Sequence, residues 1–146
     1  MVSKKEILPA VAAAIFNDKG EVLLQRRRDT NKWCIISGHV EFGETVEHAL
    51  LREIAEETNT RAHIVRFIGL YSSPESQVYY YAERTVQYIT SYFEVRLAEG
   101  IAEGFSNEET GELRFFPTDG LPEDMGLINP YWLEDALSRE GAPFVR

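Results

Sequence analysis

A run of glycine, glutamate and arginine residues at fixed spacings constrains this chain more than any other part of its sequence. The run contains Gly38, Glu44, Arg52, Glu53, Glu56 and Glu57. Positions i, i+3 and i+4 lie on one face of a helix, so we expect Glu53, Glu56 and Glu57 to project into one small volume. Like charges at this spacing cost about 0.2–0.5 kcal/mol per pair, and a divalent cation would reverse that cost. The run therefore predicts a helix that carries a metal site.

The spacing resembles the signature of the Nudix hydrolases. That signature reads Gly, five residues, Glu, seven residues, Arg-Glu, an aliphatic residue, any residue, Glu-Glu, and here it spans residues 38–60. The chain departs from it at Asn59 and Thr60, where the family has glycine and an aliphatic residue, and at Ile36-Ser37, where many relatives have Pro-Gly. Asparagine tolerates the left-handed conformation that ends many helices, so the change at Asn59 is mild. An isolated Glu-x-x-Glu-Glu is most often a solvated helix face, whereas the complete pattern is specific.

The resemblance implies a fold, a chemistry and a set of site residues. The fold would be of the α+β class, a Nudix-type α/β/α sandwich with a mixed β-sheet. The reaction would be hydrolysis of a pyrophosphate linkage with Mg²⁺ or Mn²⁺. The metal ligands would be the backbone carbonyl of Gly38 and the carboxylates of Glu53, Glu56 and Glu57. Behind these ligands, Arg52 would pair with Glu44 or with Glu56 one helical turn further on.

The general base has candidates in two places. In many relatives it lies either in the signature or on a late acidic loop, so Glu56 and Glu57 are the candidates within the signature. The late loop, residues 107–112, offers Glu108, Glu109 and Glu112. Acidic residues in a loop are more often simply solvated. Among the three we select Glu109.

Recognition of the substrate is less constrained by the sequence. Arg26 and Arg27 end a predicted strand and could bind phosphate groups, although alternation along a strand lets only some of these side chains face the site. A solvated strand end is an equally common role for such residues. Tyr71 is the tyrosine that we select as a stacking surface for a base, but alternating aromatic residues in strands are more often core or cross-strand pairs.

Three functions are compatible with the signature. Nudix enzymes that split ADP-ribose often have a proline about fifteen positions after the closing glycine of the signature, and Pro74 lies 15 positions after Asn59. Hydrolysis of a nucleoside diphosphate linked to another group, with ADP-ribose as the favoured example, is therefore the leading hypothesis. The second is a nucleoside triphosphate pyrophosphohydrolase that removes oxidised dNTPs. The third is a non-catalytic nucleotide-sensing domain, which would typically have lost one or more of these glutamates.

Composition limits the partners. The chain has 146 residues, of which 44% are hydrophobic, and we expect one domain over residues 1–146. A net charge of −9 argues against a duplex nucleic acid partner, but not against a small nucleotide bound with a cation. No apolar run is long enough to span a membrane. The one cysteine, Cys34, suits a reducing cytoplasm and resembles a small buried hydrophobic residue more than a nucleophile. Many Nudix relatives form dimers, and we expect a homodimer here.

Hydrophobic periodicity and turn residues predict the remaining elements. Residues 9–16 and 22–28 flank the turn 17–20 and are expected to form a hairpin. The acidic helix should begin after Thr45 as its N-cap and run to about Thr58. Further strands are expected at residues 62–71, 78–81, 86–97 and 112–116. Asn129 and Pro130 should cap and start a last helix that runs to about Ser138.

Overall fold

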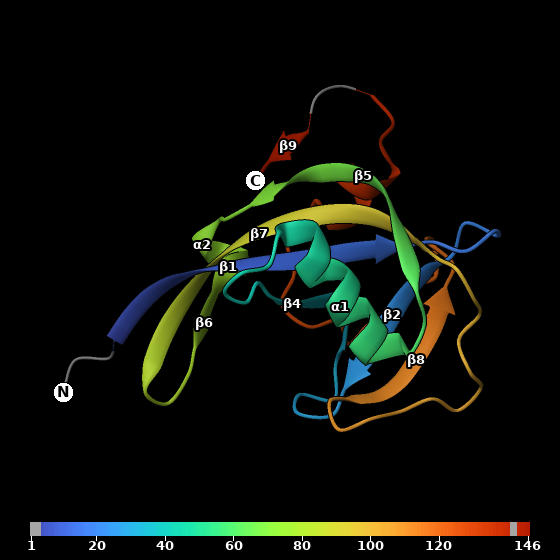
Figure 1. The fold of residues 1–146 in the computed structure, drawn as a ribbon, viewed down its shortest axis with the longest axis horizontal. Coiled ribbons are helices and arrows are strands. Elements are labelled where there is room, and N and C mark those ends of the chain that lie inside the picture. The colour runs from blue at the N-terminus through green and yellow to red at the C-terminus, as the bar shows by residue number, and fades with distance from the viewer. Residues whose placement is uncertain (1–3, 141–142) are drawn as a thin grey trace.

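Two β-sheets and three helices make up the fold in the computed structural model, which describes residues 4–140 and 143–146 (Figure 1). The strands are β1 (Lys4–Ile15), β2 (Val22–Arg27), β3 (Trp33–Cys34), β4 (Ile36–His39), β5 (Ala62–Tyr71), β6 (Val78–Tyr80), β7 (Arg84–Leu97), β8 (Thr110–Phe116) and β9 (Phe144–Val145). The helices are α1 (Val46–Thr58), α2 (Pro74–Gln77) and α3 (Trp132–Leu137).

The larger sheet is mixed. Its strand order is β4-β1-β7-β5-β9, and the short strand β6 also pairs with β7. Strand β1 is parallel to β7 and antiparallel to β4, while β5 is antiparallel to β7 and parallel to β9. The smaller sheet is antiparallel, in the order β3-β2-β8. The predicted mixed sheet is confirmed, and a second sheet accompanies it.

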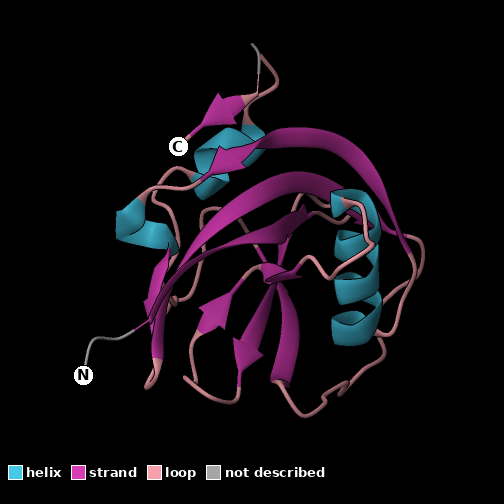
Figure 2. Ribbon diagram, turned by 60° about the vertical axis from the view of Figure 1, so that its left-hand side comes forward, coloured by secondary structure: helices cyan, strands magenta, loops and turns pink. Residues whose placement is uncertain are grey.

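Helices cover both faces of the larger sheet. Every residue from 10 to 15 of β1 is buried, and a continuous apolar run of this kind is typical of a strand that is covered on both sides. On one side, Leu50 and Ile54 of α1 belong to a core cluster with alternate residues of β1, and on the other side Trp132 and Ala136 of α3 belong to a second cluster. Figure 2 shows the longest helix on one side of the strands and the shorter helices on the other. The expected α/β/α sandwich is therefore present.

Helix α1 begins and ends as the sequence predicts. The Thr45 hydroxyl accepts a hydrogen bond of 3.1 Å from the His48 N–H, which satisfies one of the free donors at the helix N-terminus. Asn59 ends the helix in the left-handed conformation at φ 56°, and its N–H donates to the Ala55 carbonyl. Of the helices in the described ranges, none is long and apolar enough to cross a membrane.

The predicted hairpin of residues 9–16 and 22–28 is wrong. The turn itself forms, with the Asn17 N–H donating to the Glu21 carbonyl at 3.0 Å, but only an isolated bridge from Phe16 to Val22 follows it. Strand β1 then pairs with β4 and β7 in one sheet, and β2 pairs with β3 and β8 in the other. The turn residues therefore connect two sheets, because the apolar β1 is buried by partners from distant parts of the chain.

The last helix begins later than predicted. Asn129 does act as a local cap, since its side-chain oxygen accepts a hydrogen bond from the Tyr131 N–H at 2.9 Å and its carbonyl accepts one from the Trp132 N–H. Pro130 and Tyr131 form a turn, and α3 starts at Trp132. The helix is therefore two residues shorter at its start than the Asn-Pro signal indicates.

Candidate active site

Gly38 and Glu53 are in direct contact. Gly38 is fixed in β4, opposite Val11 of β1, and the Glu53 side chain from α1 lies against its α-carbon. A methyl group at position 38 would lie 2.1 Å from Cδ and 2.4 Å from Cγ of Glu53. Only glycine therefore lets the carboxylate approach the backbone of β4 this closely.

Arg52 gathers the carboxylates around it. Its Nε and Nη2 donate to the two oxygens of Glu44 at 2.7 and 2.9 Å, and its Nη1 donates to Glu53 at 3.1 Å and Glu56 at 3.3 Å. Nη2 also donates to the His39 carbonyl at 3.0 Å, which ties α1 to the end of β4. The Arg52 hydrogen bonds lower the pKa of Glu44 to about 2, so this carboxyl is charged at neutral pH. Both pairings expected for Arg52 are present at once.

Glu57 lies in a different environment from the other two glutamates. It is buried, and the Thr110 hydroxyl donates to its Oε2 at 2.6 Å. Burial raises the pKa of the Glu57 carboxyl, the hydrogen bond from Thr110 lowers it, and the neighbouring carboxyl of Glu109 raises it again, so the net shift is upward. Burial likewise raises the pKa of Glu53 despite the hydrogen bond from Arg52.

The expectation that the three carboxylates project into one small volume is not met. They share a face of α1, but Arg52 binds Glu53 and Glu56 while Thr110 binds Glu57. Within residues 4–140 and 143–146, no three acidic, histidine or cysteine side chains gather closely enough to hold a metal ion as they stand. Like charges repel, so donors intervene between the carboxylates: Arg52 for Glu53 and Glu56, and Thr110 for Glu57. Their oxygens are the donors that Mg²⁺ and Mn²⁺ prefer, and the cradle at Gly38 places one of them beside a backbone strand, so the residue types fit such a cation.

The late acidic loop is anchored to α1. The Asn107 side chain donates to the Glu56 carbonyl at 3.1 Å and accepts from the N–H groups of Glu109 and Thr110 at 2.9 and 2.7 Å. Arg28 donates to the Asn107 carbonyl at 2.7 Å, and its N–H donates to the Glu109 carbonyl at 2.9 Å. These contacts bring Glu109 beside Glu57. Nothing in the residue pattern had marked Asn107 or Thr110, since neither belongs to a motif.

The two selected arginines face opposite sides of β2. Arg26 lies over the Trp33 ring at 5.7 Å and 3.8 Å from Asp124, away from α1. Arg27 faces the other side, where its hydrogen bonds with Asp29 raise its pKa and the charge of Glu109 adds a smaller contribution. Two hydrogen bonds of 3.0 and 2.9 Å join Arg27 to Asp29, so Asp29 already neutralises this guanidinium. Of the two arginines, Arg27 is the one on the side of Glu109, and phosphate binding by either remains a prediction.

The selection of Tyr71 as a stacking surface is wrong. Only 3% of Tyr71 is exposed, and its hydroxyl donates to the buried Asp135 carboxylate. Its ring packs edge-on against Tyr92 at 5.1 Å, in the core cluster on the α3 side of the sheet. The aromatic alternation in β5 and β7 fills the core here, as it does in most strands.

A different aromatic group begins at the residue after Gly38. The His39 ring stacks on Tyr88 at 5.2 Å, and its Nε2 lies 3.1 Å from the Tyr88 hydroxyl. The Tyr81 hydroxyl lies 3.0 Å from that of Tyr88, and Tyr79 meets the Tyr88 ring edge-on at 5.5 Å. Tyr81 is 46% exposed, so this group offers an aromatic surface that Tyr71 does not.

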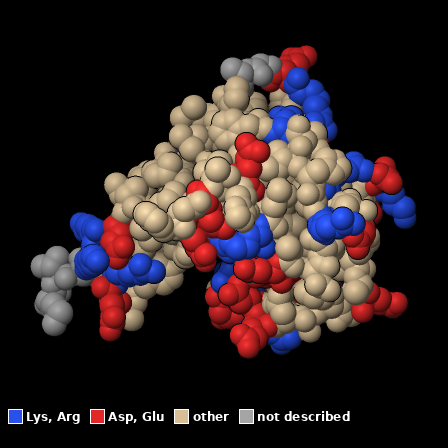
Figure 3. All heavy atoms as spheres, viewed as in Figure 1, with Lys and Arg blue, Asp and Glu red and all other residues tan. Residues whose placement is uncertain are grey.

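The face that carries α1 has a group of acidic and basic side chains (Figure 3). Figure 3, in the view of Figure 1, shows acidic atoms gathered over this face with basic atoms between them. The salt bridges from Arg52 to Glu41, Glu44, Glu53 and Glu56 account for this arrangement on α1 and the loop before it.

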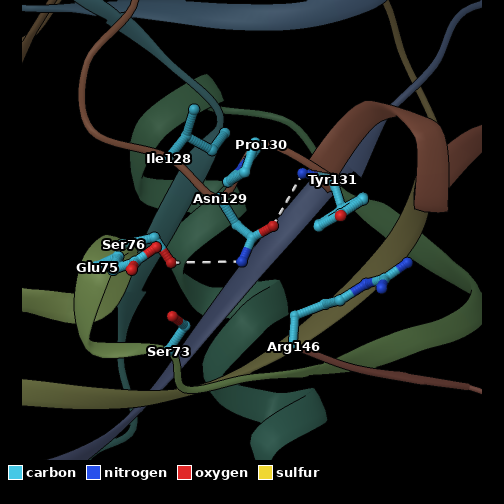
Figure 4. Close-up of a pocket in the computed structure, with 8 residues that line it drawn as sticks. All are labelled: Ser73, Glu75, Ser76, Ile128, Asn129, Pro130, Tyr131 and Arg146. Atoms are coloured by element: carbon cyan, nitrogen blue, oxygen red, sulfur yellow. Dashed lines mark hydrogen bonds between the residues drawn. The ribbon is translucent and has the colours of Figure 1, made fainter.

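A separate pocket of about 200 Å³ lies between α2 and the segment before α3 (Figure 4). It is lined by Ser73, Glu75, Ser76, Ile128, Asn129, Pro130, Tyr131 and Arg146. The buried Asn129 amide spans it, donating to the Ser76 hydroxyl at 3.4 Å and accepting from the Tyr131 N–H. None of the signature residues lines this pocket, so it is not the site that the glutamates form.

Comparison with known proteins agrees with this geometry. Residues 6–136 match the family model described as the NUDIX domain. An ADP-ribose pyrophosphatase of Methanocaldococcus jannaschii is 42% identical over 71 residues, which are 46% of this chain and 42% of that protein. An RNA pyrophosphohydrolase of Acinetobacter baylyi is 37% identical over 69 residues, which are 47% of this chain and 42% of that protein. The chain thus covers about two fifths of the length of these curated relatives.

The fold is also found among solved structures. The crystal structure of an ADP-ribose pyrophosphatase from Streptococcus suis 89-1591 superposes with a TM-score of 0.73 at 23% identity, covering 95% of this chain and 97% of that one. This superposition shows the fold, and the family match across most of the chain, together with the complete set of signature glutamates, leads to one conclusion: the chain belongs to the Nudix family.

Proposed function

We propose that this protein hydrolyses the pyrophosphate linkage of a nucleoside diphosphate joined to a second group, with Mg²⁺ or Mn²⁺ as its cofactor. The observation that carries this proposal is the arrangement on α1, where Gly38 admits the Glu53 carboxylate against β4 and Arg52 restrains Glu53 and Glu56. All the signature glutamates are present, which favours turnover over a purely sensing role.

The cation would be held by the carboxylates of Glu53, Glu56 and Glu57, with the Gly38 carbonyl as a further oxygen ligand. When bound, it would neutralise the oxygens of the pyrophosphate and lower the pKa of a bound water. Arg52 would orient the metal ligands and take no part in the reaction itself, because its guanidinium already donates to Glu44, Glu53 and Glu56.

Glu109 is our choice for the general base, ahead of Glu56 and Glu57. The Glu56 carboxylate is engaged by Arg52 and that of Glu57 by Thr110, whereas Glu109 lies beside Glu57 on an anchored loop. A base in this position would accept the proton of the attacking water on a carboxylate oxygen. Glu109→Gln should lower kcat by about 100-fold or more and leave Mn²⁺ binding in place. Glu108→Gln, on the same loop, is the matched control, and equal losses in the two variants would contradict this role.

ADP-ribose is the favoured substrate. Two observations support it: the position of Pro74, which starts α2, and the name of the Methanocaldococcus jannaschii relative. The group formed by His39, Tyr79, Tyr81 and Tyr88 would offer the stacking surface for a base.

A substrate panel tests the proposed function. Release of phosphate-containing products would be followed with ADP-ribose, nucleotide sugars, diadenosine polyphosphates and (oxidised) dNTPs, each with Mg²⁺, Mn²⁺ or EDTA. We expect ADP-ribose to be cleaved and EDTA to abolish cleavage. Preference for an oxidised dNTP would instead establish a triphosphate pyrophosphohydrolase. No cleavage by a folded protein that binds Mg²⁺ would contradict the proposed activity.

Variants of the signature test the metal ligands. Glu53→Gln and Glu57→Gln should each lower kcat by about 100-fold or more, since even residues that only orient metal ligands cost 10–100-fold. Glu47→Gln is the matched control, because it makes the same change at an exposed position of the same helix. Full activity in both ligand variants would remove the signature from the mechanism.

We also propose that the protein acts in the cytoplasm as a homodimer. Burial raises the pKa of the Cys34 thiol, which keeps it protonated and unreactive, as suits a cysteine that pairs with no other in this chain. Light scattering after gel filtration would measure the mass, and a value near 16.7 kDa would refute the dimer.

A further inference from the structure

Glu57 ends a chain of buried polar contacts that runs through the smaller sheet. Oγ1 of Thr110 lies 2.6 Å from Oε2 of Glu57 and 2.9 Å from Oε1 of Gln25, and the Gln25 amide lies 3.7 Å from Sγ of Cys34. Thr110 is 0%, Gln25 2% and Glu57 5% exposed. Buried polar groups of this kind need a partner for each hydrogen, so the contacts form one network.

A β-bulge turns Thr110 toward α1. In the pairing of β2 with β8 the register shifts between Arg26 and Arg27, which face Glu112 and Thr110, so that Gly111 is an extra residue on β8. Side chains alternate along a strand, and one extra residue reverses the alternation beyond it. Thr110 therefore leaves the face of Glu112 and joins the α1 side of the sheet.

The same side of this sheet carries the other members of the network. Leu113 and Phe115 of β8 pack in the core cluster of α1, as does Leu23 of β2. Gln25 is two residues after Leu23 and shares its face, and Cys34 is paired with Gln25 across β2 and β3. Strands β2 and β8, with the bulge in β8, thus place the Gln25 amide and the Thr110 hydroxyl next to Glu57 of α1.

We propose that Thr110 is a positioning residue for Glu57, with Gln25 as its support, and this rests on the function proposed above. The Glu57 carboxylate only accepts hydrogen bonds, so it takes the single hydrogen of the Thr110 hydroxyl. For the hydroxyl then to accept from Gln25, the amide must turn its Nε2 toward Thr110 and its Oε1 toward the Cys34 thiol, the reverse of its orientation in the structure. Every member is satisfied in this arrangement.

The consequence for the site is that the two oxygens of Glu57 differ. Oε2 is occupied by Thr110, so Oε1 is the oxygen that would bind the cation. Thr110 also follows Glu109 directly, and both N–H groups bind the Asn107 side chain. Thr110 therefore orients a proposed metal ligand through its hydroxyl, and Asn107 holds the neighbouring proposed base.

Thr110→Val and Thr110→Ser separate the hydroxyl from the packing. Valine keeps the shape and removes the donor, whereas serine keeps the donor and removes a methyl group. Mn²⁺ binding would be measured by electron paramagnetic resonance in the absence of substrate. The values of kcat and KM would be measured with the substrate that the panel identifies, and stability would be measured by thermal unfolding. We expect Thr110→Val to weaken Mn²⁺ binding and lower kcat, each by about 10–100-fold, with KM little changed. Thr110→Ser should retain most of the Mn²⁺ affinity and most of the kcat of the wild type.

Gln25→Met gives a second measurement, which decides the proposal even if Thr110→Val does not fold. Methionine has a similar volume and no amide, so Mn²⁺ binding should weaken in the same direction as in Thr110→Val but by less. In the double variant the two losses should not add, because Gln25 acts through Thr110. Additive losses would overturn the supporting role of Gln25.

The positioning role and the proposed hydrolysis fail in different ways. A wild-type protein that binds Mn²⁺ but cleaves no member of the panel contradicts the hydrolysis, while the Mn²⁺ affinities of the valine and serine variants still decide the role of Thr110. If a folded Thr110→Val variant binds Mn²⁺ as tightly as the wild type, the positioning role is overturned. If the valine variant does not fold, wild-type Mn²⁺ affinity in Gln25→Met overturns it instead. A wild-type protein that binds no Mn²⁺ would overturn both.

Discussion

Replacing Gly38 with alanine should displace the Glu53 carboxylate and leave the protein folded. The added methyl group would lie 2.1 Å from Cδ of Glu53 and 2.4 Å from its Oε1. Carbon atoms in contact prefer about 3.5–4.0 Å, so the carboxyl group must move by more than about 1 Å. It would then lose its place beside β4 and strain its hydrogen bond to Arg52.

The effects on stability and on activity should differ in size. The φ angle of Gly38 is not in the left-handed region, so alanine is compatible with the backbone and reduces the entropy of the unfolded chain, a gain of about 0.4–1 kcal/mol. Overpacking of Glu53 costs about 1–3 kcal/mol. The free energy of unfolding should therefore fall by no more than about 2.5 kcal/mol. A misplacement of about 1 Å costs about 100-fold in rate, so kcat should fall by that factor.

Two other glycines serve as controls. Gly100→Ala adds a methyl group that meets nothing within 4 Å, so kcat should not change and stability should rise by about 0.4–1 kcal/mol. Gly69→Ala places a methyl group 2.4 Å from the Phe144 carbonyl oxygen. This overlap should separate β9 from β5 and lower stability without a specific loss of kcat. The free energy of unfolding would be measured by urea denaturation, and kcat would be measured with the substrate that the panel identifies.

A double variant sharpens the test. In a Glu53→Ala background the overlap disappears, so Gly38→Ala should then stabilise the protein by about 0.4–1 kcal/mol. The reasoning is refuted if Gly38→Ala keeps the kcat of the Gly100→Ala control, or if it destabilises the protein equally with and without the Glu53 side chain.

Three further changes have distinct expected results. Thr45→Ala removes the N-cap of α1 and should cost about 1 kcal/mol in thermal unfolding while kcat stays constant. Arg52→Lys keeps the charge but cannot bind Glu44 with two hydrogen bonds, so kcat should fall by about 10–100-fold in the substrate assay. Burial raises the pKa of Asp135, but hydrogen bonds from Arg146 and Tyr71 lower it by more. The resulting stability is present above about pH 4 and is lost as pH falls through the lowered pKa, so acid titration should destabilise Asp135→Asn less than wild type.

The parts of the fold that the sequence predicts well are those determined by local patterns. The start and end of α1 follow from a hydroxyl at Thr45 and a left-handed residue at Asn59, both of which act within one turn of the helix. Strand β5 occupies the predicted residues, because alternation and flanking turns bound it on both sides. These signals need no information about distant residues.

Pairing between strands is not a local property. The turn after β1 is real, yet the strands on either side join different sheets, because β1 gains more by burial between β4 and β7 than by pairing with β2. The short elements β3, β4 and β9 have two to four residues each and were not predicted. Strands β4 and β9 form against strands from elsewhere in the chain, whereas β3 pairs with the adjacent β2 but has only two residues. The sequence of such short elements carries little signal.

The site shows the same division between local and distant information. Spacing places Glu53, Glu56 and Glu57 on one face of α1, but the donors that each carboxylate finds come from its surroundings. The tyrosine-rich pattern around Tyr71 cannot distinguish a core residue from an exposed one. Its burial depends on α3, which supplies the Asp135 carboxylate from 64 positions away.

The environment of Glu57 is the clearest case, because it depends on an irregularity. If β8 continued regularly from Glu112, Thr110 would point away from α1, and a buried carboxylate would have no donor there. An unpaired buried charge costs several kcal/mol, whereas the charge-assisted bond from Thr110 offsets much of that cost. The extra residue in β8 is therefore as important for this glutamate as the helical spacing that places it. Since the same loop carries Glu109 to the site, a change that removes the bulge should disturb both carboxylates together.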